Sequence, residues 1–201
     1  MENGLIDIIL SLRTVRNFKT DQVEDEKISL ILKAATSAPS SGNTQPWEFI
    51  VVTDFQLKKK IKSVISSTWR NHVINRLNEI DDKTRRVYDD ATQLVENSEN
   101  IPVIIFACLD LRKASKSEEA KFASIYPAVQ NLLLAAHAIG LGTCLTTHGC
   151  TPSRGEKEVK SILCIPEYVK ITALVFLGYP SKVLGPPKRH DLSTVVHING
   201  W

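Results

Sequence analysis

A run of hydrogen-bonding side chains occupies the segment between Pro39 and Pro46, directly before an apolar stretch that begins at Trp47. Gly42 and the two prolines set the turn. The remaining positions are hydroxyls and carboxamides, which offer donors and acceptors to a ligand. They are more numerous than a turn requires, and they are Ser40, Ser41, Asn43, Thr44 and Gln45. The segment is either a loop that satisfies only its own backbone or a binding loop.

Two arginines near the N-terminus, Arg13 and Arg16, are three residues apart, and Thr14 lies between them. Guanidinium groups match phosphate oxygens in a bidentate manner and stay charged at physiological pH. The pattern therefore fits a phosphate-binding site. It also fits the solvated end of a helix, where basic residues complement the helix dipole.

A second group of cations lies near the C-terminus, where Lys188 and Arg189 follow Pro186 and Pro187. The prolines stiffen the chain before the two basic residues. Taken alone, this segment is a basic surface loop. Together with the arginines at the N-terminus, it offers a further cationic contact to a phosphate.

The elements that must position these residues follow from hydrophobic periodicity. Apolar residues at Ile6, Ile9 and Leu10 predict a short N-terminal helix that leads to Arg13. The other elements expected in the first half of the chain are a helix over 24–37, a strand over 47–53 and helical segments over 56–97.

Two nearly continuous apolar runs, 101–109 and 169–177, predict strands that are covered on both faces. Between them, Ser124 is expected to cap a long helix with Pro127 in its first turn, where a missing N–H costs nothing. That helix is apolar nearly all round and should be buried. Helices around a mixed central β-sheet make the expected fold class α+β.

Composition and charge limit the class of protein. The chain has 201 residues, 43% of them hydrophobic, which is enough for the core of one domain spanning residues 1–201. The net charge of +3 is not concentrated in one tract, and the triplet Lys58–Lys59–Lys60 fits a solvated surface, so nucleic-acid binding is not expected. Neither a leader sequence nor an apolar run of membrane-spanning length is present, which predicts a soluble, cytoplasmic protein with no membrane partner.

The cysteines and histidines show no metal-binding spacing. Four cysteines without a C-x-x-C pair, at positions 108, 144, 150 and 164, fit reduced thiols. His137 falls on the buried helix and fits a core or interface histidine. The sequence predicts neither a metal site nor a catalytic acid–base residue.

Four motifs, taken in order, resemble those of the nitroreductase family of FMN-dependent oxidoreductases. They are RTVRNF at residues 13–18, SGNTQPW at 41–47, QNLLLAA at 130–136 with GLG at 140–142, and LGYP at 177–180. The resemblance runs nearly end to end, from Leu12 to about Trp201. Leu12 departs from the pattern, because family members often carry a second basic residue there; Lys188 could compensate.

The resemblance implies an FMN-binding homodimer with intertwined subunits, in which both chains line each flavin site. It implies that Arg13, Thr14 and Arg189 hold the phosphate, and that Arg16 lies near the pyrimidine edge of the flavin ring. The backbone of Gly142 and Thr143 would lie against that ring. The other subunit is implied to contribute Ser40, Ser41, Asn43 and Gln45.

The implied activity is transfer of hydride from NADH or NADPH, through the flavin N5, to a small electron acceptor by a ping-pong mechanism. The resemblance does not choose among nitroaromatics, quinones, flavins and enones as the electron acceptor. It also allows a deazaflavin as the electron donor. The alternative is a flavin-binding protein without productive NAD(P)H turnover, which would act in flavin sequestration or sensing.

Two further segments have more than one interpretation. Residues 146–152 either form part of the pocket, through His148, Gly149 or Cys150, or make an ordinary loop that enters a helix. Residues 62–97 fit a substrate lid, in which Trp69 and Tyr88 either stack on an aromatic acceptor or pack internally.

Overall fold

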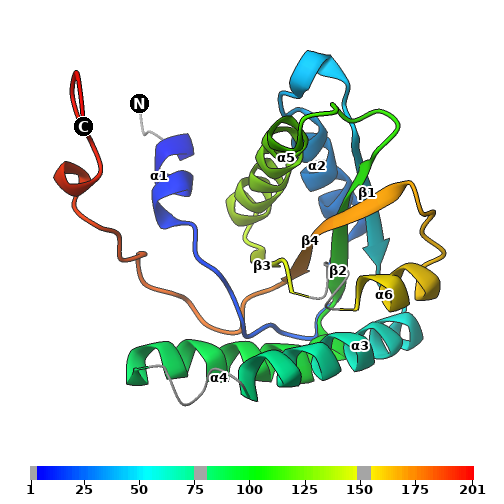
Figure 1. Ribbon diagram of the computed structural model, residues 1–201. Helices are drawn as coiled ribbons and strands as arrows, with labels where there is room; N and C mark the ends of the chain where they lie inside the picture. The colour runs from blue at the N-terminus through cyan, green and yellow to red at the C-terminus, as the bar shows by residue number, and fades with distance from the viewer. Residues whose placement is uncertain (1–3, 75–80, 149–154) are drawn as a thin grey trace.

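The computed structural model describes residues 4–74, 81–148 and 155–201 (Figure 1). Its helices are α1 (Gly4–Ser11), α2 (Asp25–Thr36), α3 (Phe55–Ile74), α4 (Asp82–Glu96), α5 (Glu118–Ala138) and α6 (Glu156–Ile162). Its strands are β1 (Trp47–Val52), β2 (Val103–Asp110), β3 (Gly142–Thr146) and β4 (Val169–Gly178). Among the described helices, none is both long enough and apolar enough to span a membrane.

The central sheet has the strand order β1-β2-β4-β3, and helices surround it, so the α+β class is confirmed. The expected mixture of strand directions is wrong, because all three pairs of described strands are antiparallel. The apolar runs could not reveal direction. A strand covered on both faces has the same continuous apolar sequence whether its neighbours are parallel or antiparallel.

Two helical layers cover the two faces of the sheet. Side chains of β2 alternate between them: Val103, Ile105, Ala107 and Leu109 pack toward α2 and α5, whereas Ile104, Phe106 and Cys108 pack toward α3, α4 and α6. This alternation explains why the run at 101–109 is apolar at every position. The sheet thus has one helical layer on each side (Figure 1).

The central helix α5 begins seven residues earlier than expected. Ser117 is its N-cap, and its hydroxyl accepts a hydrogen bond from the amide of Ala120. Pro127 therefore lies inside the helix and not in its first turn. Ser124 is not the cap; its hydroxyl donates to the carbonyl of Ala120 and accepts from the amide of Ser41. Tertiary packing of the apolar helix outweighs the loss of one backbone hydrogen bond at proline.

The expected solvation of Lys58 is also wrong. Its side chain is only 6% exposed, and its ammonium donates to the carbonyls of Ile101 and Pro102 over 2.7 and 3.2 Å. Burial lowers the pKa of Lys58, while the nearby Asp54 carboxylate raises it. The lysine links the first turn of α3 to the chain that enters β2.

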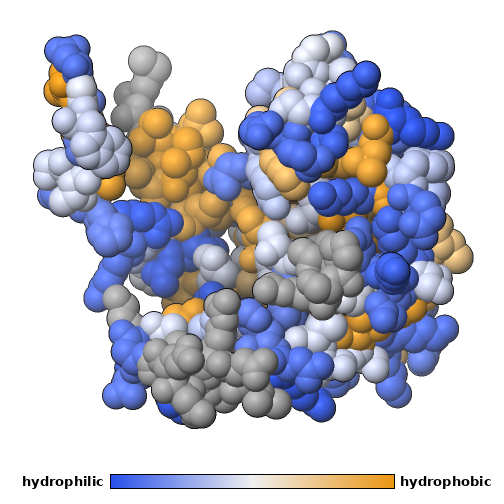
Figure 2. All heavy atoms as spheres, in the orientation of Figure 1, coloured by the Kyte–Doolittle hydropathy of each residue, from blue (hydrophilic) through white to orange (hydrophobic). Residues whose placement is uncertain are grey.

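Helix α1 and the C-terminal segment extend away from the rest of the chain (Figure 1). Helix α1 has no buried residue, and Leu5 and Leu10 are 67% and 65% exposed. Figure 2 shows an apolar area over α1, beside a hollow between the two extensions and the rest of the chain. The C-terminal segment exposes further apolar side chains, namely Leu192, Val195, Val196, Ile198 and Trp201. An eight-residue helix is not stable alone in water, so α1 requires a packing partner.

At the end of β2, Asp110 makes stability depend on pH. Hydrogen bonds from Arg112 lower the pKa of Asp110 from 3.8 to about 2. Because the folded-state pKa is depressed, the stabilisation is present above about pH 4 and is lost as the pH falls toward 2. We expect Asp110→Asn to unfold at lower urea concentration than the wild type at pH 7, and the two midpoints to converge between pH 4 and pH 2. A difference between the two urea midpoints that stays constant from pH 4 to pH 2 would contradict the lowered pKa of Asp110.

Candidate functional site

The segment that carries Arg13 and Thr14 lies directly against β3. Thr14 forms a parallel bridge with Thr143, and the amide of Val15 donates to the Thr143 carbonyl over 2.8 Å. Gly142 makes this approach possible, because a Cβ at that position would lie 2.7 Å from the Val15 side chain. The structure therefore brings together four of the expected site residues, from two segments far apart in the sequence.

A small cationic pocket of about 100 Å³ lies on this segment. Its wall includes Arg13, Thr14, Arg16 and Lys182, with Asp90 as the opposing charge. Sequence reasoning missed Lys182. The sequence feature that could have identified Lys182 is its position two residues after the LGYP motif. There the chain leaves β4 and returns to the N-terminal segment. An isolated antiparallel β-bridge between Phe18 and Pro180 joins the two segments.

A second pocket of about 210 Å³, here the apolar pocket, shares Arg13 and Lys182 with the cationic pocket. Apolar residues make up most of its remaining wall, and Gly142 and Thr143 form one side. His137 also lines it and shares a 2.9 Å hydrogen bond with the Ser11 hydroxyl, so this histidine is a partnered residue between α5 and α1.

Arg13 also fixes the start of the C-terminal segment. Its Nη1 donates to the carbonyls of Gly185 and Pro186 over 2.6 and 2.9 Å. Arg189, four residues further on, is exposed and donates to the carbonyl of Lys188. It lines neither of the two pockets that Arg13 shares, so its expected phosphate contact stays a prediction.

A third hollow of about 240 Å³, here the α3–α4 cavity, joins Arg16 to β3 residues 144–146 and to the two helices. Trp69 and Tyr88 stack on each other there, with ring centroids 5.8 Å apart and planes inclined by 24°. The Trp69 indole donates to Thr92 over 2.9 Å, which fixes its orientation. The two rings pack internally and also form one wall of the cavity.

His148 belongs to the same wall. It is buried, its Nε2 lies 3.2 Å from the Thr68 hydroxyl, and its ring meets Trp69 edge-on at 5.0 Å. It therefore packs on α3 and lines the α3–α4 cavity as well. The other residues of interest in this segment, Gly149 and Cys150, lie outside the described residues.

Cys144 on β3 faces the interior beside Arg16. Burial raises the pKa of the Cys144 thiol to about 11, and the Arg16 charge acts in the opposite direction. The thiol is therefore neutral near pH 7 and contributes packing. The electrostatic interaction indicates that the field of the Arg16 guanidinium extends to β3.

The polar loop between α2 and β1 is held in an uncommon backbone conformation. Asn43 and Gln45 have φ angles of 53° and 46°, in the left-handed region that non-glycine residues rarely adopt. The Gln45 amide donates to the Ser40 hydroxyl over 3.0 Å, and the Gln45 side chain donates to Asn43 over 3.1 Å. Strain of this kind persists where the surrounding structure fixes it, and it is concentrated at functional sites.

The polar loop and the Arg13 segment lie at opposite ends of α5 within one chain (Figure 1). The loop contacts α5 at Ser124, where the Ser41 amide donates to the serine hydroxyl over 3.1 Å. The Arg13 segment contacts β3, which follows the other end of the helix. Ser124 and Ala138 are separated by roughly 20 Å along the axis at 1.5 Å per residue. One chain therefore does not bring the two groups of expected residues together.

The α+β fold, the four sequence motifs and the cations gathered beside β3 together point to one family. The family model described as the nitroreductase family matches residues 9–179. The chain belongs to the nitroreductase family.

Relatives differ in the activity that their names state. An iodotyrosine deiodinase of Thermotoga neapolitana is 30% identical over 179 residues, which cover 88% of each chain. A protein of Archaeoglobus fulgidus, provisionally named an NADH dehydrogenase/NAD(P)H nitroreductase, is 30% identical over 176 residues, which cover 87% of this chain and 84% of that protein. The family thus includes more than one activity.

Solved structures agree on the fold. An iodotyrosine deiodinase bound to FMN and 3-iodo-L-tyrosine superimposes with a TM-score of 0.79 at 26% identity, covering 98% of this chain and all of that one. An NADPH:FMN oxidoreductase from Vibrio harveyi, complexed with NAD+, gives a TM-score of 0.74 at 22% identity over 99% of this chain and 78% of that one. Family membership and the FMN-bound deiodinase neighbour support FMN-dependent oxidoreduction as the general chemistry.

Proposed function

We propose that this protein is an FMN-dependent oxidoreductase that takes hydride from NADH or NADPH and reduces a small electron acceptor. The observation that carries the proposal is the convergence of Arg13, Thr14, Arg16 and Lys182 on one pocket, in a segment that Thr14 anchors to β3 at Thr143. No single segment of the chain contains this group of residues; the fold assembles it.

The residues at this position fit FMN. The cofactor has a dianionic phosphate, and the pocket offers it two cations, Arg13 and Lys182, together with the Thr14 hydroxyl. Arg16 lines both the cationic pocket and the α3–α4 cavity, so its charge can stabilise negative charge on the ring during reduction. When bound, FMN supplies the hydride-transfer chemistry. The protein supplies binding, orientation and electrostatics.

The site requires a second copy of the chain. The polar loop of one protomer is separated from the Arg13 segment of the same protomer by the length of α5. A homodimer in which α1 and the C-terminal segment pack on the partner would cover their exposed apolar side chains. The same arrangement would bring Ser40, Ser41, Asn43 and Gln45 of the partner subunit to the flavin.

The α3–α4 cavity favours a small, flat acceptor. Its wall combines apolar side chains with the stacked rings of Trp69 and Tyr88 and a single guanidinium, Arg16. Aromatic rings stack on planar partners, and a guanidinium hydrogen-bonds to carbonyl or nitro oxygens. Quinones and nitroaromatics combine both properties.

Anaerobic reduction tests the proposed function. The FMN-loaded protein is mixed with NADH or NADPH, and the flavin absorbance near 450 nm is followed. We expect bleaching with at least one donor and recovery of the absorbance when a quinone or nitroaromatic is added. Flavin that binds but is bleached by neither donor would favour the flavin-binding protein. Failure to bind FMN would overturn the proposal.

A further inference from the structure

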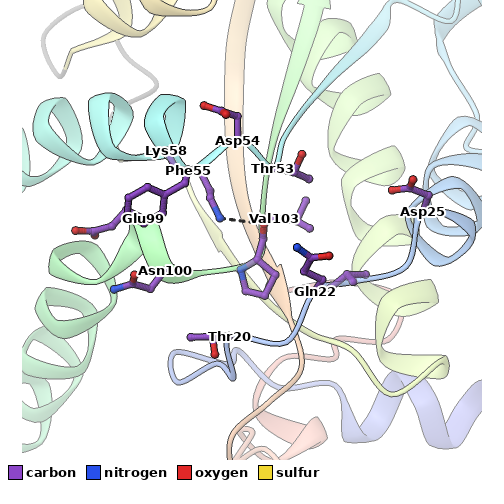
Figure 3. Close-up of a pocket in the computed structure, with 12 residues that line it drawn as sticks. Thr20, Gln22, Asp25, Thr53, Asp54, Phe55, Lys58, Glu99, Asn100 and Val103 are labelled. Atoms are coloured by element: carbon purple, nitrogen blue, oxygen red, sulfur yellow. Dashed lines mark hydrogen bonds between the residues drawn. The ribbon is translucent and has the colours of Figure 1, made fainter.

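A cavity of about 600 Å³, larger than any of those around Arg13 and Arg16, lies between the N-terminal ends of α2 and α3 (Figure 3). Its volume is within the range that holds small organic ligands. It lies apart from the expected flavin residues, and nothing in the proposed function uses its walls. We therefore consider what chemistry those walls would recognise.

One wall carries a buried donor. Lys58 donates to the carbonyls of Ile101 and Pro102, and among the described residues these are its hydrogen-bond acceptors. An ammonium group has three N–H donors. One donor of a nearly fully buried side chain is thus left for a ligand with an acceptor atom, such as a ring nitrogen.

The opposite wall carries a carboxylate and a carboxamide. Asp25 and Gln22 face the hollow across from Lys58 and Phe55 (Figure 3). With Asp54 and Glu99, the walls contain three carboxylates and one ammonium. Lys62 pairs with Glu99 over 2.9 Å, so the negative charge that remains comes from Asp25 and Asp54 against Lys58. A phosphate inside this cavity would be repelled, whereas hydroxyl and amino groups would find acceptors.

An aromatic ring stands at the mouth of the cavity. Phe55, the first residue of α3, is 48% exposed although it is a large apolar side chain. Its face is available for stacking on a planar heterocycle. A flat ring with acceptor nitrogens, joined to a sugar that carries a diol, would satisfy Phe55, Lys58 and Asp25 together. Adenosine has this chemistry.

A hollow of about 240 Å³, here the amide cavity, lies between this cavity and the proposed catalytic region and shares wall residues with both. The amide cavity shares Thr20 and Asn100 with the 600 Å³ cavity, here the α2–α3 cavity, and it shares Arg16 with the α3–α4 cavity. Asn17 and Asn97 add carboxamides to its wall. A guanidinium and several amide donors suit a pyrophosphate, which the α2–α3 cavity itself would repel.

We propose that the α2–α3 cavity binds the adenosine half of the reduced nicotinamide donor, and that its carboxylates select NADH over NADPH. This inference rests on the proposed function. The selection follows from charge: a carboxylate accepts hydrogen bonds from the ribose hydroxyls of NADH, but it repels the 2′-phosphate of NADPH.

The test compares NADH with reduced nicotinamide mononucleotide, which carries the same reducing ring but lacks the adenosine half. In the FMN-loaded enzyme, Phe55→Ala should raise the KM for NADH about tenfold, the size expected for one lost stacking contact. The KM for the mononucleotide should not change. Leu30→Ala, an exposed apolar residue of α2 outside the cavity, is the matched control.

Charge selection and direct binding provide two further measurements. The wild type should have a lower KM for NADH than for NADPH. Asp25→Asn should bring the ratio of these two KM values closer to one. Calorimetric titration with ADP-ribose should show binding that Phe55→Ala weakens. Lys58→Met should weaken it too; if that variant does not fold, Phe55→Ala and Asp25→Asn decide the question.

The inference would be overturned if Phe55→Ala left the KM for NADH unchanged. It would also be overturned if the substitution raised the KM for NADH and the KM for the mononucleotide by the same factor. A wild-type preference for NADPH would also overturn it. Failure of the proposed function is distinguishable, because the wild type would then be reduced by none of the three donors.

Discussion

Arg13→Ala should lower the affinity for FMN by about 10- to 100-fold. The substitution removes a charge-assisted contact with the phosphate, and hydrogen bonds to charged groups contribute about 1.5–3 kcal/mol. It also removes the hydrogen bonds that hold the Gly185 and Pro186 carbonyls, which frees the start of the C-terminal segment. The flavin dissociation constant, measured by quenching of FMN fluorescence, checks the prediction.

The control for this experiment is Lys157→Ala, which removes an exposed cation from α6, outside the pockets that Arg13 lines. Arg13→Lys separates the two roles of the arginine, because lysine keeps the charge but loses the planar fork. It should give an intermediate affinity. An Arg13→Ala variant that purifies with full flavin content would show that the phosphate is bound elsewhere.

The double variant Ile6→Asp, Leu10→Asp should be monomeric and should lose FMN together with the dimer. Both side chains are exposed on α1 in the single chain. Burying an apolar side chain of this size is worth about 1.5–3 kcal/mol, so two charges placed on the interface should weaken association by at least 100-fold. Sedimentation velocity across a concentration series measures the monomer–dimer equilibrium.

Leu111→Asp serves as the matched control, because Leu111 is exposed at the end of β2 and away from α1. It should leave both the dimer and the flavin content intact. If the α1 variant stays dimeric, α1 does not form the interface. If it becomes monomeric and still binds FMN at wild-type affinity, one chain is enough to make the site.

Much of the candidate site follows from local sequence signals. The residues of the Arg13 segment and of the polar loop stand out because their side chains exceed what a turn or a helix end needs. The proximity of Thr14 to Thr143 is encoded less visibly, in Gly142, where only a missing side chain lets the two segments meet. A motif implies such contacts only when the family pattern is recognised.

Other features depend on tertiary structure and could not be predicted from sequence. Lys58 belongs to a basic triplet typical of a surface, yet its ammonium is buried because it donates to the carbonyls of Ile101 and Pro102 before β2. Helix α5 continues through Pro127 because packing on both sides compensates for the lost hydrogen bond. Lys182 carries no motif of its own and reaches the cationic pocket only because the chain turns back after β4.

Native mass spectrometry of the protein equilibrated with FMN tests the central claim most directly, since it reports chain number and cofactor number in one spectrum. The account predicts a species of two chains carrying two FMN molecules, because each site needs the Arg13 segment of one protomer and the polar loop of its partner. A single chain that retains one FMN would contradict the shared site. A dimer that binds no FMN would contradict the proposed function itself.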